Sequence, residues 1–163
     1  MESINTELDL KMKNRSQLDT SSSLGGESRV YKKIAGVIKM RVGKGVGRHE
    51  LVYSKYDLIY YKEINSYYKN KRLITLIFNY YYLDSALVKF EDINYERKQS
   101  EDSQRITKRN VLYLDNGRIL YEDLDKKHPN KTSKHDLQIL LENAAFQIDQ
   151  FRLIRKYEKE NNY

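Results

Sequence analysis

The sequence of 163 residues predicts an α+β fold, in which two helices pack on a mostly antiparallel sheet that follows a disordered N-terminal arm. Three observations favour this class. Residues 73–83 form a nearly continuous apolar run, typical of a central strand. Asn116-Gly117 separates two short apolar segments, as in a tight β-hairpin. Residues 133–157 carry apolar side chains at helical spacing.

The first 28 residues differ from the rest in composition. Residues 20–26 are rich in Ser and Gly, and no sustained apolar periodicity precedes them. We therefore predict a disordered arm over 1–28 and a single α+β domain over 29–163. Removal of the arm is expected to leave the domain folded.

The first strand and the first helix are predicted between residues 34 and 72. Alternating side chains predict a strand over 34–42, and the Gly-rich segment 43–47 predicts a flexible turn after it. Ser54-Lys55-Tyr56-Asp57 fits a capping box, so a helix of about 15 residues is expected to follow. Its apolar positions recur at helical spacing and are expected to face the core: Tyr56, Tyr60, Ile64 and Tyr67.

The second half of the chain predicts strands followed by a helix. After the central strand at 73–83 we expect a short strand at 86–90, a mobile polar loop at 91–109 and a hairpin at 111–121. Ser133 and Asp136 form a second capping box. The helix that follows is expected to dock on the sheet through one apolar face: Leu137, Leu141, Ala144, Ile148 and Phe151.

The positive charge is concentrated in one block. The net charge of the chain is +7, and residues 29–72 alone carry +9. Such a block attracts nucleic-acid backbones or anionic lipid headgroups, although it can also be a solvated face that aids solubility. The candidate binding residues are Lys32, Lys33, Lys39, Arg41, Lys44, Arg48, Lys69, Lys71 and Arg72.

The sequence offers no catalytic constellation. Without Cys there is no thiol nucleophile, and the three His lie in different segments. The carboxylate pairs are adjacent residues in polar loops, where solvated charge is the usual role. We therefore expect no enzymatic activity, no metal and no cofactor. The first 30 residues lack the apolar core of a signal peptide, so the protein is expected not to be secreted.

The order of elements resembles a known viral family. A basic strand at 37–42 leads to Tyr53-Ser54-Lys55-Tyr56-Asp57, then to a helix ended by Lys71-Arg72 and an apolar strand from Leu73. This order is similar to the opening of the globular domain of rhabdovirus matrix proteins, and the Lys, Asn, Ile and Tyr content suits small plant-infecting members. The chain departs from the family in having a single Pro and an acidic arm.

The resemblance implies a structural protein that self-associates and bridges nucleocapsid RNA and an anionic membrane. Such a protein would lie in the host cytoplasm, peripherally on the membrane and inside the virion, as a homo-oligomer. Two alternatives stay open. The chain can be a small basic RNA- or ssDNA-binding protein without a membrane role, or an adaptor whose basic block meets an acidic protein.

Overall fold

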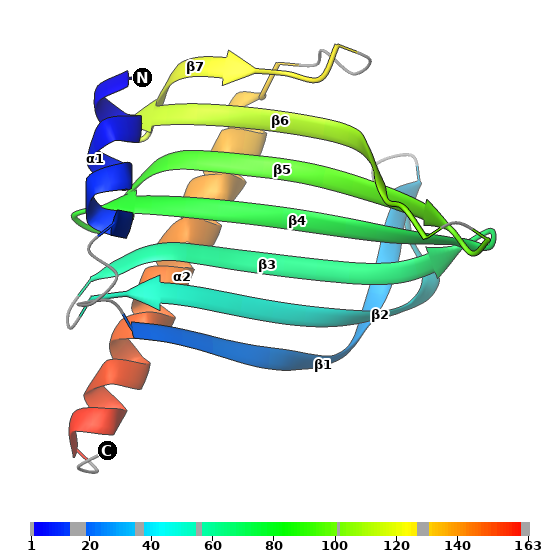
Figure 1. Ribbon diagram of the computed structural model, residues 1–163, viewed down its shortest axis with the longest axis horizontal. Coiled ribbons are helices and arrows are strands. Elements are labelled where there is room, and N and C mark those ends of the chain that lie inside the picture. The colour runs from blue at the N-terminus through cyan, green and yellow to red at the C-terminus, as the bar shows by residue number, and fades with distance from the viewer. Residues whose placement is uncertain are drawn as a thin grey trace.

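The structure, a computed structural model, describes residues 2–13, 19–34, 38–54, 57–100, 102–126 and 131–160, with the backbone alone over 19–45. A seven-stranded sheet lies between two helices, one near each end of the chain (Figure 1). The elements in order are α1 (Glu2–Lys13), β1 (Asp19–Ile34), β2 (Ile38–Tyr53), β3 (Leu58–Lys69), β4 (Arg72–Leu83), β5 (Ala86–Lys98), β6 (Arg105–Asp115), β7 (Arg118–Asp123) and α2 (Lys134–Glu160).

The sheet is an antiparallel meander, in which each strand pairs with the next one in sequence, in the order β1 to β7. Tight turns make this possible. The turns at Asn70-Lys71, Asp84-Ser85 and Asn116-Gly117 have positive φ at both residues. This backbone matches the right-handed twist of the flanking strands, and Asn, Asp and Gly tolerate it best.

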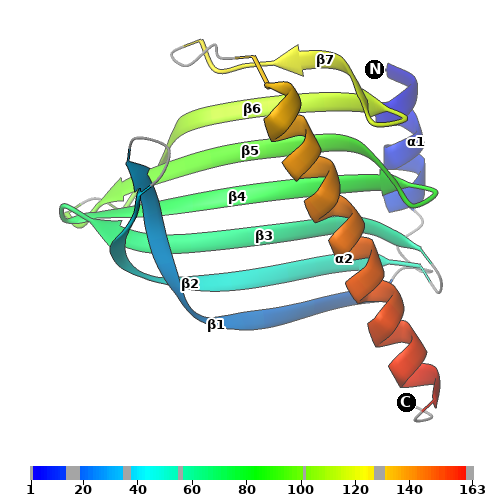
Figure 2. The same ribbon diagram turned by 180° about the vertical axis from the view of Figure 1, so that it is seen from behind.

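The core lies between α2 and one face of the sheet, which we name the α2 face. Figure 2 shows α2 crossing this face diagonally. Leu114 and Tyr82 are almost fully buried there, at 0% and 1% exposure. The helix contributes the buried side chains that its apolar spacing predicts, among them Ala144, Ile148 and Phe151. The predicted docking of this helix on the sheet is therefore confirmed.

The opposite face, which we name the open face, is covered by α1 at one end of the strands (Figure 1). Leu8 of α1 is buried, Asn5 Nδ2 donates to the Tyr113 hydroxyl at 3.2 Å, and Lys11 Nζ lies 2.9 Å from Asp84 Oδ1. The prediction of a disordered arm is wrong, because α1 covers Glu2–Lys13 and β1 begins at Asp19, whereas residues 14–18 lie outside the described residues. The division of the chain at residue 28 falls inside β1 and stays a prediction, which deletion variants test.

The predicted fold class, an antiparallel sheet packed by two helices with one of them in the middle of the chain, is also wrong. The arrangement is compatible with an α+β class, but both helices lie outside the strand region. The segment expected as a helix is β3. Ser54 does bond Asp57, through Ser54 N to Asp57 O at 2.9 Å and Asp57 N to Ser54 Oγ at 3.3 Å, but this pair closes the β2–β3 turn. The same local bonds serve turns and helix caps. Tyr and Ile then favour a strand.

Three smaller predictions are corrected as well. The strand expected at 34–42 covers the end of β1 and the start of β2, and residues 35–37 between them lie outside the described residues. The glycines at 43–47 lie within β2 and do not form a turn. Most of the loop expected at 91–109 is β5 and β6. Their mixed charges are cross-strand pairs, which a sequence pattern does not distinguish from a solvated loop.

Other local signals are confirmed. The apolar run is β4, the middle strand of the sheet, and the Asn-Gly pair joins β6 to β7. Helix α2 begins directly after Ser133, whose Oγ accepts from Asp136 N at 3.1 Å. Neither described helix combines the length and the apolar content that a membrane-spanning helix needs.

Candidate nucleic-acid interface

The meander brings distant parts of the basic block to one end of the sheet, on the right in Figure 1. We name this the basic end and define it by residues 28–34, 38–45, 67–74, 95–100 and 102–107. The register joins its parts, because Gly45 pairs with Tyr67, Tyr68 with Leu73, and Arg72 with Lys98. Eight of the nine predicted binding residues have their backbone at this end: Lys32, Lys33, Lys39, Arg41, Lys44, Lys69, Lys71 and Arg72.

Five of these residues belong to the far part of the β1–β2 hairpin. Figures 1 and 2 agree that this part leaves the sheet and bends to the side of α2. The pairing register shifts between Leu24 and Glu27, and again between Val30 and Tyr31. Such β-bulges bend a strand and increase its twist. The bend places the backbone of one part of the basic end on the side of α2. This part contains Lys32, Lys33, Lys39, Arg41 and Lys44.

The β3–β4 turn supplies two exposed lysines to the basic end. Lys69 and Lys71 are exposed, and neither pairs with an Asp or Glu among the residues whose side chains are described. Arg72 Nη1 contacts Glu96 Oε1, and Arg105 Nη2 lies 3.4 Å from the same oxygen. One carboxylate therefore serves two guanidinium groups, and the surroundings of the turn stay net positive.

Sequence reasoning missed the contribution of β5 and β6 to this end. Lys98 lines a shallow depression of about 420 Å³ together with Asn70, Lys71, Arg72, Gln99 and Ser100. Arg97 and Arg105 stand on the same two strands. Their charges were visible in the sequence, but only the strand pairing shows that they adjoin the β3–β4 turn.

An aromatic side chain accompanies these cations. Tyr68 is 61% exposed, and it directly precedes Lys69 at the end of β3. An exposed tyrosine ring beside phosphate-binding cations is the arrangement on which unpaired bases stack. The sequence pattern predicted Tyr56, Tyr60 and Tyr67 on a buried helix face and gave Tyr68 no role, so it missed this residue.

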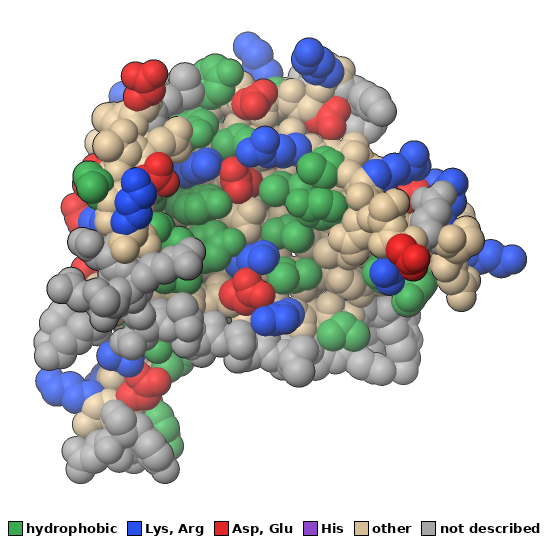
Figure 3. All heavy atoms as spheres, in the orientation of Figure 1, with side chains coloured by type: hydrophobic (Ala, Val, Ile, Leu, Met, Phe, Trp, Pro, Cys, Tyr) green, Lys and Arg blue, Asp and Glu red, His purple; other side chains and the backbone are tan. Residues whose placement is uncertain are grey.

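Arg48 is the one predicted residue that lies elsewhere. Its Nη2 is 3.3 Å from Glu50 Oε1, and Lys62 Nζ lies 3.2 Å from Glu50 Oε2, in the middle of the open face. Figure 3 shows Lys and Arg side chains alternating with Asp and Glu over the middle of this face. Paired cations attract a polyanion less than free ones, so Arg48 is a weaker candidate than Lys69 and Lys71.

The centre of the open face is a closed network around Glu91, which is 7% exposed. Glu91 Oε2 accepts from Asn79 Nδ2 at 3.1 Å and from the Tyr81 hydroxyl at 3.0 Å. Lys89 and Arg109 lie 3.3 and 3.5 Å from Glu91 Oε1. Burial raises the pKa of Glu91, but the charge of Lys89 and the hydrogen bonds outweigh it and lower the pKa overall. Glu91 thus stays charged and offsets part of the positive charge of Lys89 and Arg109.

The histidines and carboxylates do not form a metal site in the described part of the chain. His49 lies in β2 and His135 is exposed at the start of α2, whereas His128 lies outside the described residues. Among the residues described, no group of three or more His, Asp or Glu side chains is placed to hold a metal ion.

No family model matches this sequence, and neither a curated protein nor a solved structure is significantly similar to it. The helix after Ser54, which contributes to the resemblance to rhabdovirus matrix proteins, is strand β3. The function is therefore argued from the geometry of this chain alone.

Proposed function

We propose that the protein binds single-stranded nucleic acid through the basic end of the sheet. One observation carries the proposal: the strand register gathers residues from both ends of the basic block, 29–34 and 38–45 with 69–72, at the same end of the sheet. In the middle of the open face, in contrast, Arg48, Lys62, Lys89 and Arg109 each pair with a carboxylate, Glu50 or Glu91, whereas Lys69 and Lys71 pair with none among the described side chains.

The binding mode follows from the side chains of the β3–β4 turn. Lys69 and Lys71 neutralise phosphates and release counterions, which makes the affinity depend on salt. Tyr68 offers a ring on which a base stacks, without preference for sequence. An anionic membrane would use the same cations but would gain little from a single exposed tyrosine. Nucleic acid is therefore the favoured partner.

A double charge reversal tests the electrostatic part. Lys69→Glu/Lys71→Glu is compared with Lys134→Glu/Lys159→Glu, which makes the same change in net charge on α2. Fluorescence anisotropy with labelled oligouridine is measured over a salt series. Each lost phosphate contact lowers the slope of log affinity against log salt by about 0.7 for single strands. The slope should therefore fall by about 1.4 for the turn variant and should change little for the α2 variant. Equal losses from both variants would contradict the proposal.

A tyrosine pair tests the stacking part. Tyr68→Ala is compared with Tyr157→Ala, because the two tyrosines are 61% and 65% exposed. Stacking contributes about 1–3 kcal/mol per base, so Tyr68→Ala should weaken binding by roughly 5- to 150-fold at constant salt slope. If both variants bind as the parent does, no base stacks on Tyr68.

A matrix-type function is the second candidate, and one observation favours it. Helix α2 exposes large apolar side chains away from the core, including Phe146, Leu153 and Tyr157 at 59–65% exposure. Self-associating proteins need such a surface. Light scattering at low salt and flotation with anionic vesicles distinguish the two candidates. Polymers that float with vesicles favour the matrix function, and a monomer that binds only RNA excludes it.

A further inference from the structure

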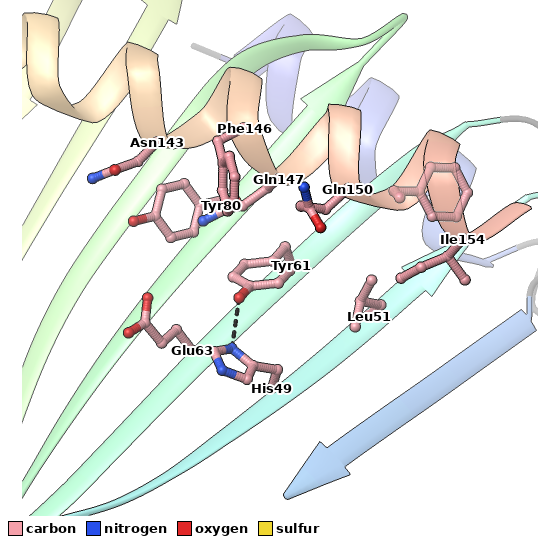
Figure 4. A pocket seen from close by; sticks show the side chains of 11 residues that line it. His49, Leu51, Tyr61, Glu63, Tyr80, Asn143, Phe146, Gln147, Gln150 and Ile154 are labelled. Carbon is pink, nitrogen blue, oxygen red and sulfur yellow. Dashed lines mark hydrogen bonds between the residues drawn. The ribbon is translucent and has the colours of Figure 1, made fainter. Parts of the chain in front are cut away.

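A groove runs along the flank of α2 on the α2 face of the sheet, and it shares no lining residue with the depression at the β3–β4 turn. It consists of two adjoining cavities of about 510 and 600 Å³, which share Glu63, Tyr80 and Asn143 in their linings. Figure 4 shows the first cavity, with side chains of α2 on one side and of β2 to β4 on the other. Each volume is that of a site for a small organic molecule.

The floor of the groove is aromatic. Tyr61, Tyr80 and Phe90 follow one another across β3, β4 and β5 in register, and Phe78 lies one pleat further along β4. The ring centroids of Tyr61 and Tyr80 are 5.9 Å apart, and those of Tyr80 and Phe90 are 5.0 Å apart. Neighbouring strands hold these rings, so the floor is formed before any ligand arrives.

The wall of the groove is a second stripe of α2. Ile139, Asn143, Phe146 and Gln150 recur every three or four residues and line the cavities. Phe146 is 63% exposed, although the rings of Tyr61 and Tyr80 lie below it in Figure 4. A ligand in the groove would cover this ring. This stripe of two apolar and two amide side chains is separate from the apolar stripe that docks α2 on the sheet.

A carboxylate stands where the two cavities meet. Glu63 pairs across the sheet with His49 on one side and with Phe78 on the other. Its Oε1 accepts from Asn65 Nδ2 at 2.7 Å, and no cation pairs with it among the side chains described. The neighbouring acid of the groove differs, because Asp92 contacts Lys108 Nζ. Lys131 also lines the second cavity, but it does not pair with Glu63. Glu63 is thus the acid at the junction of the two cavities that contacts no cation among the described side chains.

The charge of Glu63 acts on the aromatic floor. Burial, followed by the charge of Glu63, raises the pKa of the Tyr61 phenol. The same two causes raise the pKa of Tyr80 to about 12, although a hydrogen bond with Gln147 opposes them. The Tyr61 hydroxyl bonds His49 Nδ1 at 2.5 Å, which fixes both rings beside the carboxylate. The rings and the carboxylate therefore present negative potential to the same space.

We propose that this groove binds a small organic ammonium ion, with its charged nitrogen at Glu63 and its apolar body on the floor rings. A cation over aromatic faces is attracted by the ring quadrupole, and the carboxylate adds a charged hydrogen bond. An anion would meet an uncompensated carboxylate, and a neutral ligand would leave it without a partner. The groove is independent of the basic end, so either proposal can fail alone.

Three probes that differ in charge test the proposal. These are 2-phenylethylamine, 2-phenylethanol and 3-phenylpropionate, which share a phenyl ring on a short chain. Titrations followed by protein NMR should give the amine a dissociation constant of about 1 mM, as expected for so small a ligand. The alcohol should bind at least tenfold more weakly, and the acid should not bind. A blocked Ala-Lys-Ala peptide shows whether a lysine side chain is preferred over a free amine.

Two matched pairs of variants locate the site. Glu63→Gln keeps the shape and an acceptor for Asn65, and should weaken amine binding about tenfold, whereas Glu142→Gln outside the groove should not. Phe146→Ala should weaken the amine and the alcohol alike. Leu153→Ala, at 59% exposure on the same helix, should weaken neither. Melting curves confirm that each variant folds. Equal affinity for amine and alcohol, or parental amine binding by Glu63→Gln, would overturn the proposal.

Discussion

Neighbouring residues of the same strands build two different surfaces on the two faces of the sheet. On the α2 face, Leu51, Tyr61, Tyr80, Phe90 and Leu112 lie side by side across β2 to β6. The residues adjacent in sequence to these five form the matching row on the open face. They are Glu50, Lys62, Asn79, Glu91 and Val111.

The comparison shows how the register of this sheet is fixed. A shift of one residue would turn the aromatic row to the open face and bury the charged row under α2. One row gains stability by excluding water. The other gains it by satisfying each buried polar group with a partner. The α2 face should therefore respond most to the loss of volume, and the open face to the loss of charge.

The largest effect is expected on the α2 face. Phe151 is 3% exposed and its ring centroid lies 5.2 Å from that of Tyr53. Phe151→Ala should lower the free energy of unfolding by about 3–5 kcal/mol, because it removes contacts and leaves a cavity. Leu153→Ala, on the solvent side of α2, should change it by less than about 0.5 kcal/mol. Urea denaturation followed by circular dichroism measures both. Equal midpoints would mean that the helix is not docked.

Loss of charge on the open face should lower the free energy of unfolding by a smaller amount. Glu91→Gln weakens two ion pairs and turns two accepted hydrogen bonds into weaker ones, so about 1–3 kcal/mol is expected. Glu50→Gln is the control, since its pairs with Arg48 and Lys62 are more exposed and should contribute about 0–1 kcal/mol. The same denaturation experiment ranks the two variants.

The pH dependence separates charge from shape at Glu91. Its pKa in the folded protein is below the ordinary value of 4.5, so the unfolded chain binds the proton more readily. Its stabilisation is complete above that value and is lost as the pH falls through the folded pKa. The stability gap between the parent and Glu91→Gln should therefore close below pH 4.5. If the difference in stability persists in acid, the substitution acts through the packing of the side chain and not through its charge.

A smaller effect is expected where α2 begins. Ser133 Oγ accepts from the Asp136 amide at 3.1 Å, and Ser133→Ala should cost about 1 kcal/mol, because one amide of the first turn loses its acceptor. Ser133→Asp keeps an acceptor and should retain most of the stability. Thermal melts of the two variants provide the comparison. Equal melting temperatures would show that docking, and not the cap, fixes the start of the helix.

The smallest effect is expected where α1 meets the open face. Lys11 Nζ and Asp84 Oδ1 are 2.9 Å apart, but the Asp84 side chain is 85% exposed. Lys11→Ala should therefore cost about 0.2–1 kcal/mol. Lys13→Ala, in the same turn of α1, is the control and should cost nothing measurable. A loss above 2 kcal/mol would show that α1 contributes much more to the fold than its contacts indicate.

Local signals explain which elements the sequence predicts. The apolar stripe of α2, the run of β4 and the Asn116-Gly117 turn each depend on a few adjacent residues. Strand β3 was missed because Tyr60, Ile64 and Tyr67 satisfy helical spacing. The β2–β3 turn also contains the Ser54–Asp57 bond that marks a helix start. Strand β1 was missed because its Ser- and Gly-rich sequence becomes a strand only through pairing with β2.

The binding surfaces were predictable only in part. Charge density along the chain identified the basic block, but not that Glu50 pairs with Arg48 while Lys69 and Lys71 have no such partner among the described side chains. The groove gave no sequence signal, because His49, Glu63 and Phe146 meet only when β2, β3 and α2 are assembled. Both features depend on strand register and helix docking, which arise from contacts distant in sequence.

The meander order also determines how the chain can fold. Each strand pairs with its neighbour in sequence, so each new hairpin closes a short loop and the sheet can grow stepwise from any turn. Helix α2 cannot take part early, because the strands that it crosses must first lie side by side. During synthesis α2 thus cannot cover the row from Leu51 to Leu112 until its own residues are made. A chain truncated before Ser133 should therefore aggregate while its hairpins are already formed.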